Sequence, residues 1–328
     1  MVMKRRRTHV RLSVIGLAAA LLLAPILVIA QASAQTPDAA GSWTTGPAML
    51  TARTEVAAAE ANGILHVVGG YPGGDASPDT HEAYDSGTGS WSYRHALPVG
   101  LHHACAASVD GRLYIVGGYL VSGPAVDTVY AYSAADDSWS ALASMPTRRG
   151  ALVCPVLDGK IYAIGGDGPG GDSGAVEVYD PATDTWDASL PPMPTPGNHI
   201  AGGALNGRLH IVGGRAARGG ALMQTHEVLD PATRNWSQAA PLPTGRSGMT
   251  ATVYRGRLHV IGGEGGPATF SEHEAFDPVS GSWLTFAPLP TARHGLGVVT
   301  LGDAIYVASG GPQPGATFSN VLELFTLP

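Results

Sequence analysis

The stretch Arg257-Leu-His-Val-Ile-Gly-Gly263, a short apolar run that ends in two glycines, decides the fold because it recurs along the chain. Four further copies end in glycine pairs that begin at Gly69, Gly117, Gly165 and Gly213, and a weaker sixth copy reads Ala304-Ile-Tyr-Val-Ala-Ser-Gly310. The first glycines of the five intact pairs are 48, 48, 48 and 49 residues apart. A fixed period of this length indicates one structural unit that is repeated.

Each unit contains the signals of four short strands. The first strand, for example residues 54–61, ends in a dipeptide that suits a two-residue hairpin turn. These dipeptides are Asn62-Gly63, Asp110-Gly111, Asp158-Gly159 and Asn206-Gly207, with Arg255-Gly256 and Gly302-Asp303 as variants. The third strand alternates, as in residues 81–84, and ends in an aromatic residue or leucine, and a Trp seven positions later opens the fourth. Five of the six tryptophans occupy this phase, and no helical period interrupts the units.

The two ends of the chain complete each other. The sixth unit stops at Pro328 without a Trp, whereas Gly41-Ser-Trp43 matches Gly89-Ser-Trp91 of the first unit. The N-terminal strand is therefore expected to complete the last sheet. Because a four-stranded sheet must cover its faces by stacking on its neighbours, the sequence predicts an all-β, six-bladed β-propeller of antiparallel blades over residues 41–328.

The first 34 residues have the pattern of a secretory signal, with a short linker at residues 35–40. A basic segment that includes Lys4-Arg5-Arg6-Arg7 precedes an apolar stretch at residues 12–30, and Ala32-Ser33-Ala34 is a small-x-small cleavage site. The sequence thus predicts a secreted or periplasmic protein with no membrane span after cleavage. An uncleaved N-terminal anchor is the alternative, because the apolar stretch is long enough to cross a bilayer.

The charge balance limits the partners. Residues 1–34 hold five of the 19 basic residues and none of the 26 acidic ones, which leaves 14 against 26 in the rest. This excess of acid argues against nucleic acid, whose phosphates require a basic face. We expect a protein, peptide or glycan ligand and a monomeric propeller.

The apolar strand, the glycine pair, the aromatic residue and the Trp at this spacing closely resemble the kelch repeat. The resemblance covers residues 41–328. The departures are local: His66, His210 and His259 stand where the repeat usually has Tyr, and Leu229 replaces the aromatic residue. Kelch propellers include both binding modules and enzymes, so the resemblance implies the fold and leaves the function to the site.

The residues that enter each first strand are expected to surround the mouth of the central channel. Counted from the link proline or its equivalent, four arginines hold the third position: Arg53, Arg149, Arg246 and Arg293. Because guanidinium groups pair with carboxylates, the mouth is predicted to bind an acidic ligand, and the resemblance implies the same role. Alternatively, these arginines pack over the first strand and bond to loop carbonyls. Four neighbours complete the predicted binding set: His102, Asn198, Ser247 and His294.

The leading functional prediction is an exported binding module that uses this mouth and the variable loops after the glycine pairs. The alternative is a sugar-acid isomerase or mutarotase, because the periplasmic N-acetylneuraminate epimerases are similar six-bladed kelch propellers. Four residues would then be candidates for proton transfer: Glu55, His103, His199 and His294. No phosphate loop, zinc spacing or nucleophile elbow is present, which favours binding over catalysis. Mouth histidines from several blades could bind a metal, but no spacing requires one, so neither a metal nor a cofactor is predicted.

Two further sets of residues are expected to stabilise the fold. Cys105 and Cys154 fall at opposite phases of the first strands in adjacent units, so they could face each other and form a disulfide in an oxidising compartment. The alternative is two separate buried thiols. Six histidines at two fixed strand positions are predicted to be structural: His66, His81, His210, His226, His259 and His273.

Overall fold

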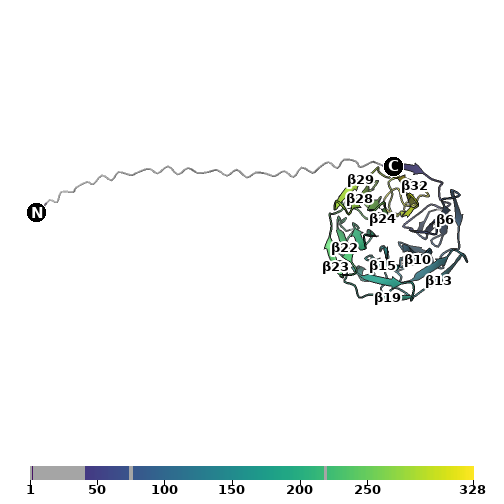
Figure 1. The fold of residues 1–328 in the computed structure, drawn as a ribbon, viewed down its shortest axis with the longest axis horizontal. Helices are drawn as coiled ribbons and strands as arrows, with labels where there is room; N and C mark the ends of the chain where they lie inside the picture. The colour runs from purple at the N-terminus through teal and green to yellow at the C-terminus, as the bar shows by residue number, and fades with distance from the viewer. Residues whose placement is uncertain (1, 3–40, 74–76, 218–219) are drawn as a thin grey trace. The chain divides into compact units, whose positions relative to one another are not determined.

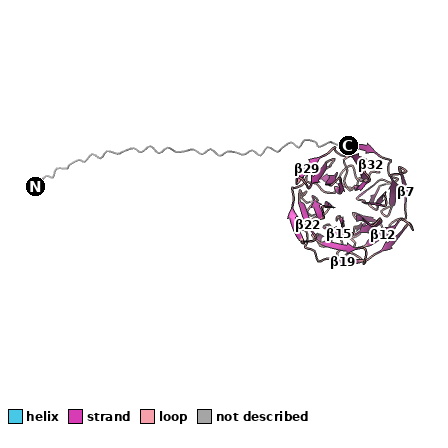
Figure 2. Ribbon diagram, viewed as in Figure 1, coloured by secondary structure: helices cyan, strands magenta, loops and turns pink. Residues whose placement is uncertain are grey.

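The computed structural model describes residues 2, 41–73, 77–217 and 220–328 of the 328-residue chain. No residue in these ranges is helical, so the described part contains no helix that could cross a membrane (Figure 2). The proposed signal peptide and linker, residues 1–34 and 35–40, lie outside the described residues apart from Val2.

Six antiparallel four-stranded sheets form the blades, and their first strands face a common axis (Figure 1). Blade 1 contains β3 (Ala57–Ala61), β4 (Ile64–Val68), β6 (His81–Asp85) and β7 (Ser90–Tyr93). Blade 2 contains β9 (Cys105–Val109), β10 (Arg112–Val116), β12 (Val129–Ser133) and β13 (Ser138–Ala141). Blade 3 contains β14 (Val156–Leu157), β15 (Lys160–Ile164), β18 (Val176–Asp180) and β19 (Thr185–Asp187).

The second half of the ring follows the same order. Blade 4 contains β20 (Ala201–Leu205), β21 (Arg208–Val212), β22 (His226–Asp230) and β23 (Asn235–Gln238). Blade 5 contains β24 (Thr250–Tyr254), β25 (Arg257–Ile261), β28 (His273–Asp277) and β29 (Ser282–Thr285). Blade 6 contains β30 (Gly297–Leu301), β31 (Ala304–Ala308), β32 (Leu322–Thr326) and β1 (Ser42–Thr45).

Blade 6 confirms that the N-terminal strand closes the ring. Strand β1 pairs antiparallel with β32, and Trp43 lies opposite Phe325. The predicted hairpin dipeptides also adopt the expected backbone: φ is 54° at Asn62 and 81° at Gly63. Asparagine and glycine tolerate this left-handed region best, which explains why these residue types recur at the first turn.

The hydrophobic core lies between neighbouring blades. One cluster, for example, joins Cys105 and Tyr114 of blade 2 to Ile161 and Tyr179 of blade 3. Each Trp indole N–H donates to a main-chain carbonyl of the preceding link. The acceptors for Trp43, Trp91, Trp139, Trp186, Trp236 and Trp283 are Ala287, Pro47, His95, Ala143, Pro191 and Ala240, at 2.8–3.0 Å. The fixed phase of the tryptophans therefore reflects one contact repeated at every blade interface.

The glycine pairs allow the next blade's entry segment to pack closely against them. A Cβ atom at Gly69, where φ is +66°, would lie 2.4 Å from the carbonyl oxygen of Leu101, the first residue of β8 (Leu101–His102). The residue after each glycine pair, or after Ser309-Gly310 in blade 6, then forms a β-bridge or short ladder with its own blade's entry segment. These partners are Thr54–Tyr71, His102–Tyr119, Gly150–Asp167, Asn198–Arg215, Ser247–Glu264 and His294–Gly311. The glycine pairs thereby place one loop residue from each blade at the channel mouth.

Candidate functional site

A ring of six residues at the start of the first strands defines the mouth of the channel. We call it the entry ring, and it consists of Glu55, His103, Ala151, His199, Gly248 and Gly295. All six have φ between 52° and 64°, which is the left-handed region. The amide N–H groups of His103, Ala151, His199, Gly248 and Gly295 each donate to the carbonyl of the preceding ring member, at 2.9–3.1 Å. This chain of bonds holds non-glycine residues in a backbone conformation that they seldom adopt, a feature that clusters at functional sites.

The side chains of the entry ring are unevenly distributed. Glu55, His103 and His199 carry long polar side chains, whereas the other three positions hold alanine or glycine. A Cβ atom at Gly295 would lie 2.6 Å from the carboxyl carbon of Glu55. The missing side chain at Gly295 therefore makes room for the Glu55 carboxyl group at the axis.

Six side chains meet at the axis and form the axial cluster: Glu55, His103, His199, Arg215, Glu264 and His294. His103 Nε2 lies 3.2 Å from Glu55 Oε2. Arg215 donates from Nη2 to His199 Nε2 at 2.9 Å and from Nη1 to Glu264 Oε1 at 3.1 Å. His294 Nε2 lies 3.6 Å from one carboxyl oxygen of each of the two glutamates. All four histidine and glutamate candidates for proton transfer thus lie in one cluster.

Burial controls the electrostatics of this cluster. Loss of solvent raises the pKa of Glu55 to about 8, and the nearby Glu264 carboxylate adds to the effect, whereas Arg215 opposes it. Burial also lowers the pKa of His103 well below its usual value, with further contributions from His199 and His102. His103 is therefore neutral at physiological pH.

A polar pocket of about 360 Å³ opens beside the cluster and is lined by residues of blades 1 to 4. Its walls include Tyr71, His102, Tyr119, Asn198 and Arg215. The Tyr71 and His102 rings stack with centroids 3.8 Å apart, and the Tyr119 ring lies 5.4 Å from the His102 ring. We call this space the mouth pocket. Below it, the central channel of about 400 Å³ is lined by the first strands of all six blades.

The four predicted arginines lie elsewhere than expected. Each is buried within its own blade and forms an ion pair with a third-strand glutamate. The pairs are Arg53–Glu82, Arg149–Glu177, Arg246–Glu274 and Arg293–Glu323. Their guanidinium groups also donate to main-chain carbonyls; Arg149 Nη1, for example, donates to Gly165 O at 2.6 Å. The geometry corresponds to the structural alternative, so these four are not part of the site proposed below.

The remaining predicted binding residues lie close to the axis. His102 lines the mouth pocket, and Asn198 donates from Nδ2 to Asp172 Oδ1 at 2.6 Å while its Oδ1 lies 2.6 Å from His199 Nδ1. Ser247 is buried, and its amide donates to Glu264 O at 3.0 Å. Asn198 therefore contacts the His199 ring, and Ser247 holds the backbone of Glu264.

The residue-by-residue prediction missed Arg215 and Glu264 and the tyrosines of the mouth pocket. The signal was present, because Tyr71, Tyr119, Arg215 and Glu264 all directly follow a glycine pair. The variability of the loops after the glycine pairs indicated these loops as candidate binding segments, but it did not indicate the first position of each loop. The fixed register of the entry bridges explains why that position lies at the channel mouth in every blade.

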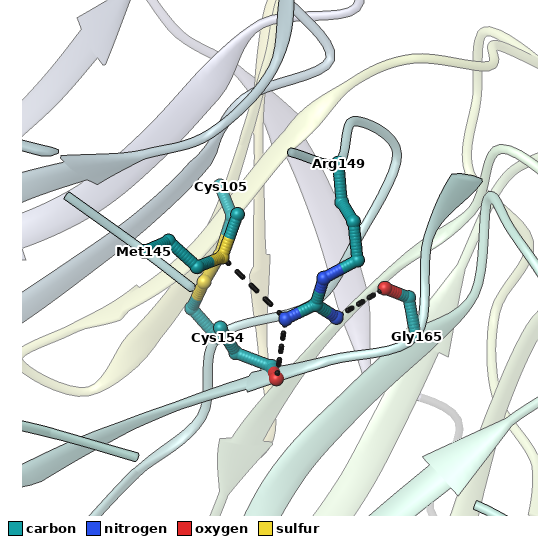
Figure 3. Close-up of a disulfide and its surroundings, with 6 residues drawn as sticks. Cys105, Met145, Arg149, Cys154 and Gly165 are labelled. Carbon is teal, nitrogen blue, oxygen red and sulfur yellow. Dashed lines mark hydrogen bonds between the residues drawn. A yellow bond between two sulfur atoms is a disulfide. The ribbon is translucent and has the colours of Figure 1, made fainter. Parts of the chain in front are cut away.

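Cys105 and Cys154 form a disulfide between blades 2 and 3, with their Cα atoms 5.9 Å apart. Both residues also line the channel. Figure 3 shows Arg149 beside this disulfide, with Met145 Sδ 3.5 Å from its Nη2. The disulfide thus joins two blades just below the entry ring.

The predicted structural histidines form three buried pairs within single blades. Nδ1 of the second-strand histidine lies 2.8–2.9 Å from Nε2 of the third-strand histidine. The pairs are His66–His81, His210–His226 and His259–His273. The sequence predicted their structural role. It did not predict that each second-strand histidine contacts the third-strand histidine of the same blade.

The profile of the KLHDC2/KLHL20/DRC7 Kelch-repeats domain matches residues 55–241, which is more than half of the chain. The chain belongs to the kelch-repeat family. The kelch propeller is also similar to the protein described in "Structure of YjhT", with a TM-score of 0.75 and 18% sequence identity over 86% of this chain and 97% of that one. At this identity the likeness shows the fold alone. No curated protein matches the chain in sequence.

Proposed function

We propose that this kelch propeller is an exported binding module that holds a small acidic ligand in the mouth pocket, with Arg215 as the residue that receives the ligand's acidic group. The observation that carries the proposal is the position of Arg215, whose side chain is 20% exposed beside the pocket. The side chains of the four predicted arginines, in contrast, are at most 2% exposed.

The hydrogen bonds of Arg215 leave it able to bind a ligand. Among the described residues it donates from Nε to Asn198 Oδ1, from Nη1 to Glu264 and from Nη2 to His199. A guanidinium group carries five N–H donors in a planar fork, so two remain for an acidic oxygen. The stacked Tyr71, His102 and Tyr119 rings supply a flat wall against which a sugar ring or a peptide could pack.

Thermal unfolding tests this proposal. The panel contains sialic and uronic acids, acidic peptides and the matching neutral sugars. A ligand at 100 times its Kd stabilises the fold by about 2.7 kcal/mol, which raises Tm by a measurable amount. We expect a shift with an acidic ligand in the wild type and in Arg208→Met, whose arginine is exposed on β21, but not in Arg215→Met. An equal shift in Arg215→Met would contradict the proposed role.

Isomerisation of an acidic sugar is the second candidate, favoured by the 3.2 Å contact between Glu55 Oε2 and His103 Nε2. A base that takes the proton of the anomeric hydroxyl, and an acid that protonates the ring oxygen, would break the ring C–O bond and permit closure to the other anomer. NMR exchange between the anomers tests this. A rate no faster than that in buffer would eliminate this candidate while leaving binding intact.

The proposal that the protein is exported is based on the signal-like sequence of residues 1–34. The Cys105–Cys154 disulfide supports it, since disulfides persist in oxidising compartments. We expect the protein in the periplasmic or secreted fraction, as a monomer in sedimentation, with Gln35 as its N-terminal residue. Recovery of the full-length chain in the membrane fraction would instead support the uncleaved anchor.

A further inference from the structure

Three potential metal ligands from three different blades meet in the entry ring. One ligand atom each from Glu55, His103 and His199 lies within 4.8 Å of the other two. His103 Nε2 and Glu55 Oε2 are 3.2 Å apart. The left-handed backbone at all three positions, with φ of 52–54°, turns their side chains toward a common centre.

We propose that Glu55, His103 and His199 form a binding site for a divalent first-row transition metal ion such as Zn²⁺. Two imidazoles and one carboxylate are a common ligand set for these ions, and a site with three protein ligands keeps a position open for water or substrate. Metal–ligand bonds of about 2.1 Å require the widest of the present separations to contract. Rotation of the side chains within the channel mouth, where Gly248 and Gly295 leave space, permits this.

The neighbours of the two histidines orient them as metal ligands. His199 Nδ1 lies 2.6 Å from Asn198 Oδ1, an acceptor that retains the proton on Nδ1 and leaves the Nε2 lone pair toward the axis. His103 Nδ1 lies 2.6 Å from His102 Nδ1, which can accept its proton in the same way. Metal-binding histidines are typically held by a hydrogen bond to the second ring nitrogen. The neighbours therefore supply an independent feature of a metal site.

The groups around the centre also suit a metal ion. Glu55 and Glu264 both direct carboxyl oxygens at it, and Arg215 pairs with Glu264, which leaves Glu55 as the acidic ligand for the ion. His294 donates from Nδ1 to Gly311 O at 3.1 Å, so its Nε2 is directed at the two carboxyl groups. A divalent ion at this centre would therefore meet oxygen and nitrogen ligands from several blades.

Arg215 is the competitor that the metal must displace. Its Nη2 now donates to His199 Nε2, the lone pair that the metal would use. After metal binding, the guanidinium keeps Asn198 and Glu264 as partners and gains a donor for a ligand. The metal would also occupy the Glu55 and His103 atoms that the isomerase candidate needs. The metal site does not depend on the ligand proposed above.

Metal titration of the untagged chain tests the proposal. After treatment with EDTA and removal of the chelator, Zn²⁺ binding is measured by calorimetry, and Co²⁺ binding by its visible absorption. We expect one ion per chain in the wild type and in the control His95→Gln, which removes an exposed histidine on an outer link. Glu55→Gln and His199→Gln should each weaken binding roughly tenfold or more and change the Co²⁺ spectrum.

Two results would overturn the metal site. One is the absence of stoichiometric Zn²⁺ binding by the wild type. The other is wild-type affinity in both Glu55→Gln and His199→Gln, which would assign the ion to an adventitious surface position. Unfolding curves establish that both variants are folded, and Arg215→Met separates the two proposals because it should abolish ligand binding but retain the metal.

Discussion

The four Arg–Glu pairs and the axial cluster both bury charge near the channel mouth, yet their electrostatics differ. Arg53 and Glu55 are two residues apart in the sequence. Arg53 is buried inside blade 1 against Glu82, with four hydrogen bonds from its Nη1 and Nη2 atoms. Glu55 lies at the axis, where its nearest charged neighbours include a second carboxylate, Glu264. Arg53 is therefore matched by its own carboxylate, whereas the cation near Glu55, Arg215, is already paired with Glu264.

This difference separates structural from functional charge. Each Arg–Glu pair lies within one blade, so the blade can fold with its charges matched. The axial cluster draws residues from blades 1, 2, 4, 5 and 6, and it exists only when the ring is closed. Stability is therefore expected to depend on the pairs, and ligand binding on the cluster.

The largest expected effect is the loss of one buried arginine. Arg149→Met should destabilise the propeller by about 3–5 kcal/mol, because the Glu177 carboxylate would remain buried without its cation. Arg148→Met is the matched control: the adjacent arginine is 61% exposed in its pair with Asp127, and such pairs contribute about 0–1 kcal/mol. Denaturant unfolding measures both. Equal losses in the two variants would show that the burial of the pair is unimportant.

The disulfide beside Arg149 provides the next test. Its cysteines are separated by 49 residues in the sequence, and the chain-entropy relation gives about 4 kcal/mol for a loop of that length. Cys105→Ala/Cys154→Ala should therefore lower stability by up to that amount while leaving the Arg149–Glu177 pair in place. Wild-type protein in reductant should show the same loss. If the double variant unfolds at the same denaturant concentration as oxidised wild type, the cross-link contributes nothing.

The blades themselves contain a third comparison. Blades 1, 4 and 5 have a His–His pair, whereas the same two positions hold Tyr114 and Val129 in blade 2. Burial lowers the pKa of His66 to about 4 and that of His81 to about 3, from 6.5. Because the unfolded chain takes up these protons more readily, the pair's contribution is complete above pH 6.5 and is lost as the pH falls toward 4.

Copying blade 2 into blade 1 tests this pH dependence. His66→Tyr/His81→Val should lose less stability on acidification than wild type. At pH 4.5 the difference in the free energy of unfolding should be about 3 kcal/mol for each buried histidine that stays unprotonated in folded wild type. Chemical unfolding at pH 7.0 and pH 4.5 measures the difference, and the pH 7.0 curve shows whether the variant is folded. A parallel loss of stability in both proteins would show that this pair does not sense pH.

The sequence predicts the fold almost completely because each repeat contains the local signals of its own strands and turns. The glycine pair, the turn dipeptide and the Trp each fix a local contact, and six copies make the phase unambiguous. The site is different because its residues share no local signal. Glu55, His103 and His199 are 48 and 96 residues apart, and only the closed ring brings equal phases together at the axis. The sequence also does not give the direction of a side chain, because sequence position alone places Arg53 and Glu55 equally near the mouth.

The smallest expected effect lies in the axial cluster. In metal-free protein, Glu55→Gln should leave stability unchanged or raise it by up to about 1 kcal/mol, because the carboxyl group is buried and faces Glu264. Glu177→Gln, the same chemical change in an Arg–Glu pair, should instead cost about 3 kcal/mol or more. Unfolding of both variants in EDTA makes the comparison. A loss in Glu55→Gln as large as that in Glu177→Gln would mean that the axial glutamate stabilises the fold, and the division between matched pairs and an unbalanced cluster would be wrong.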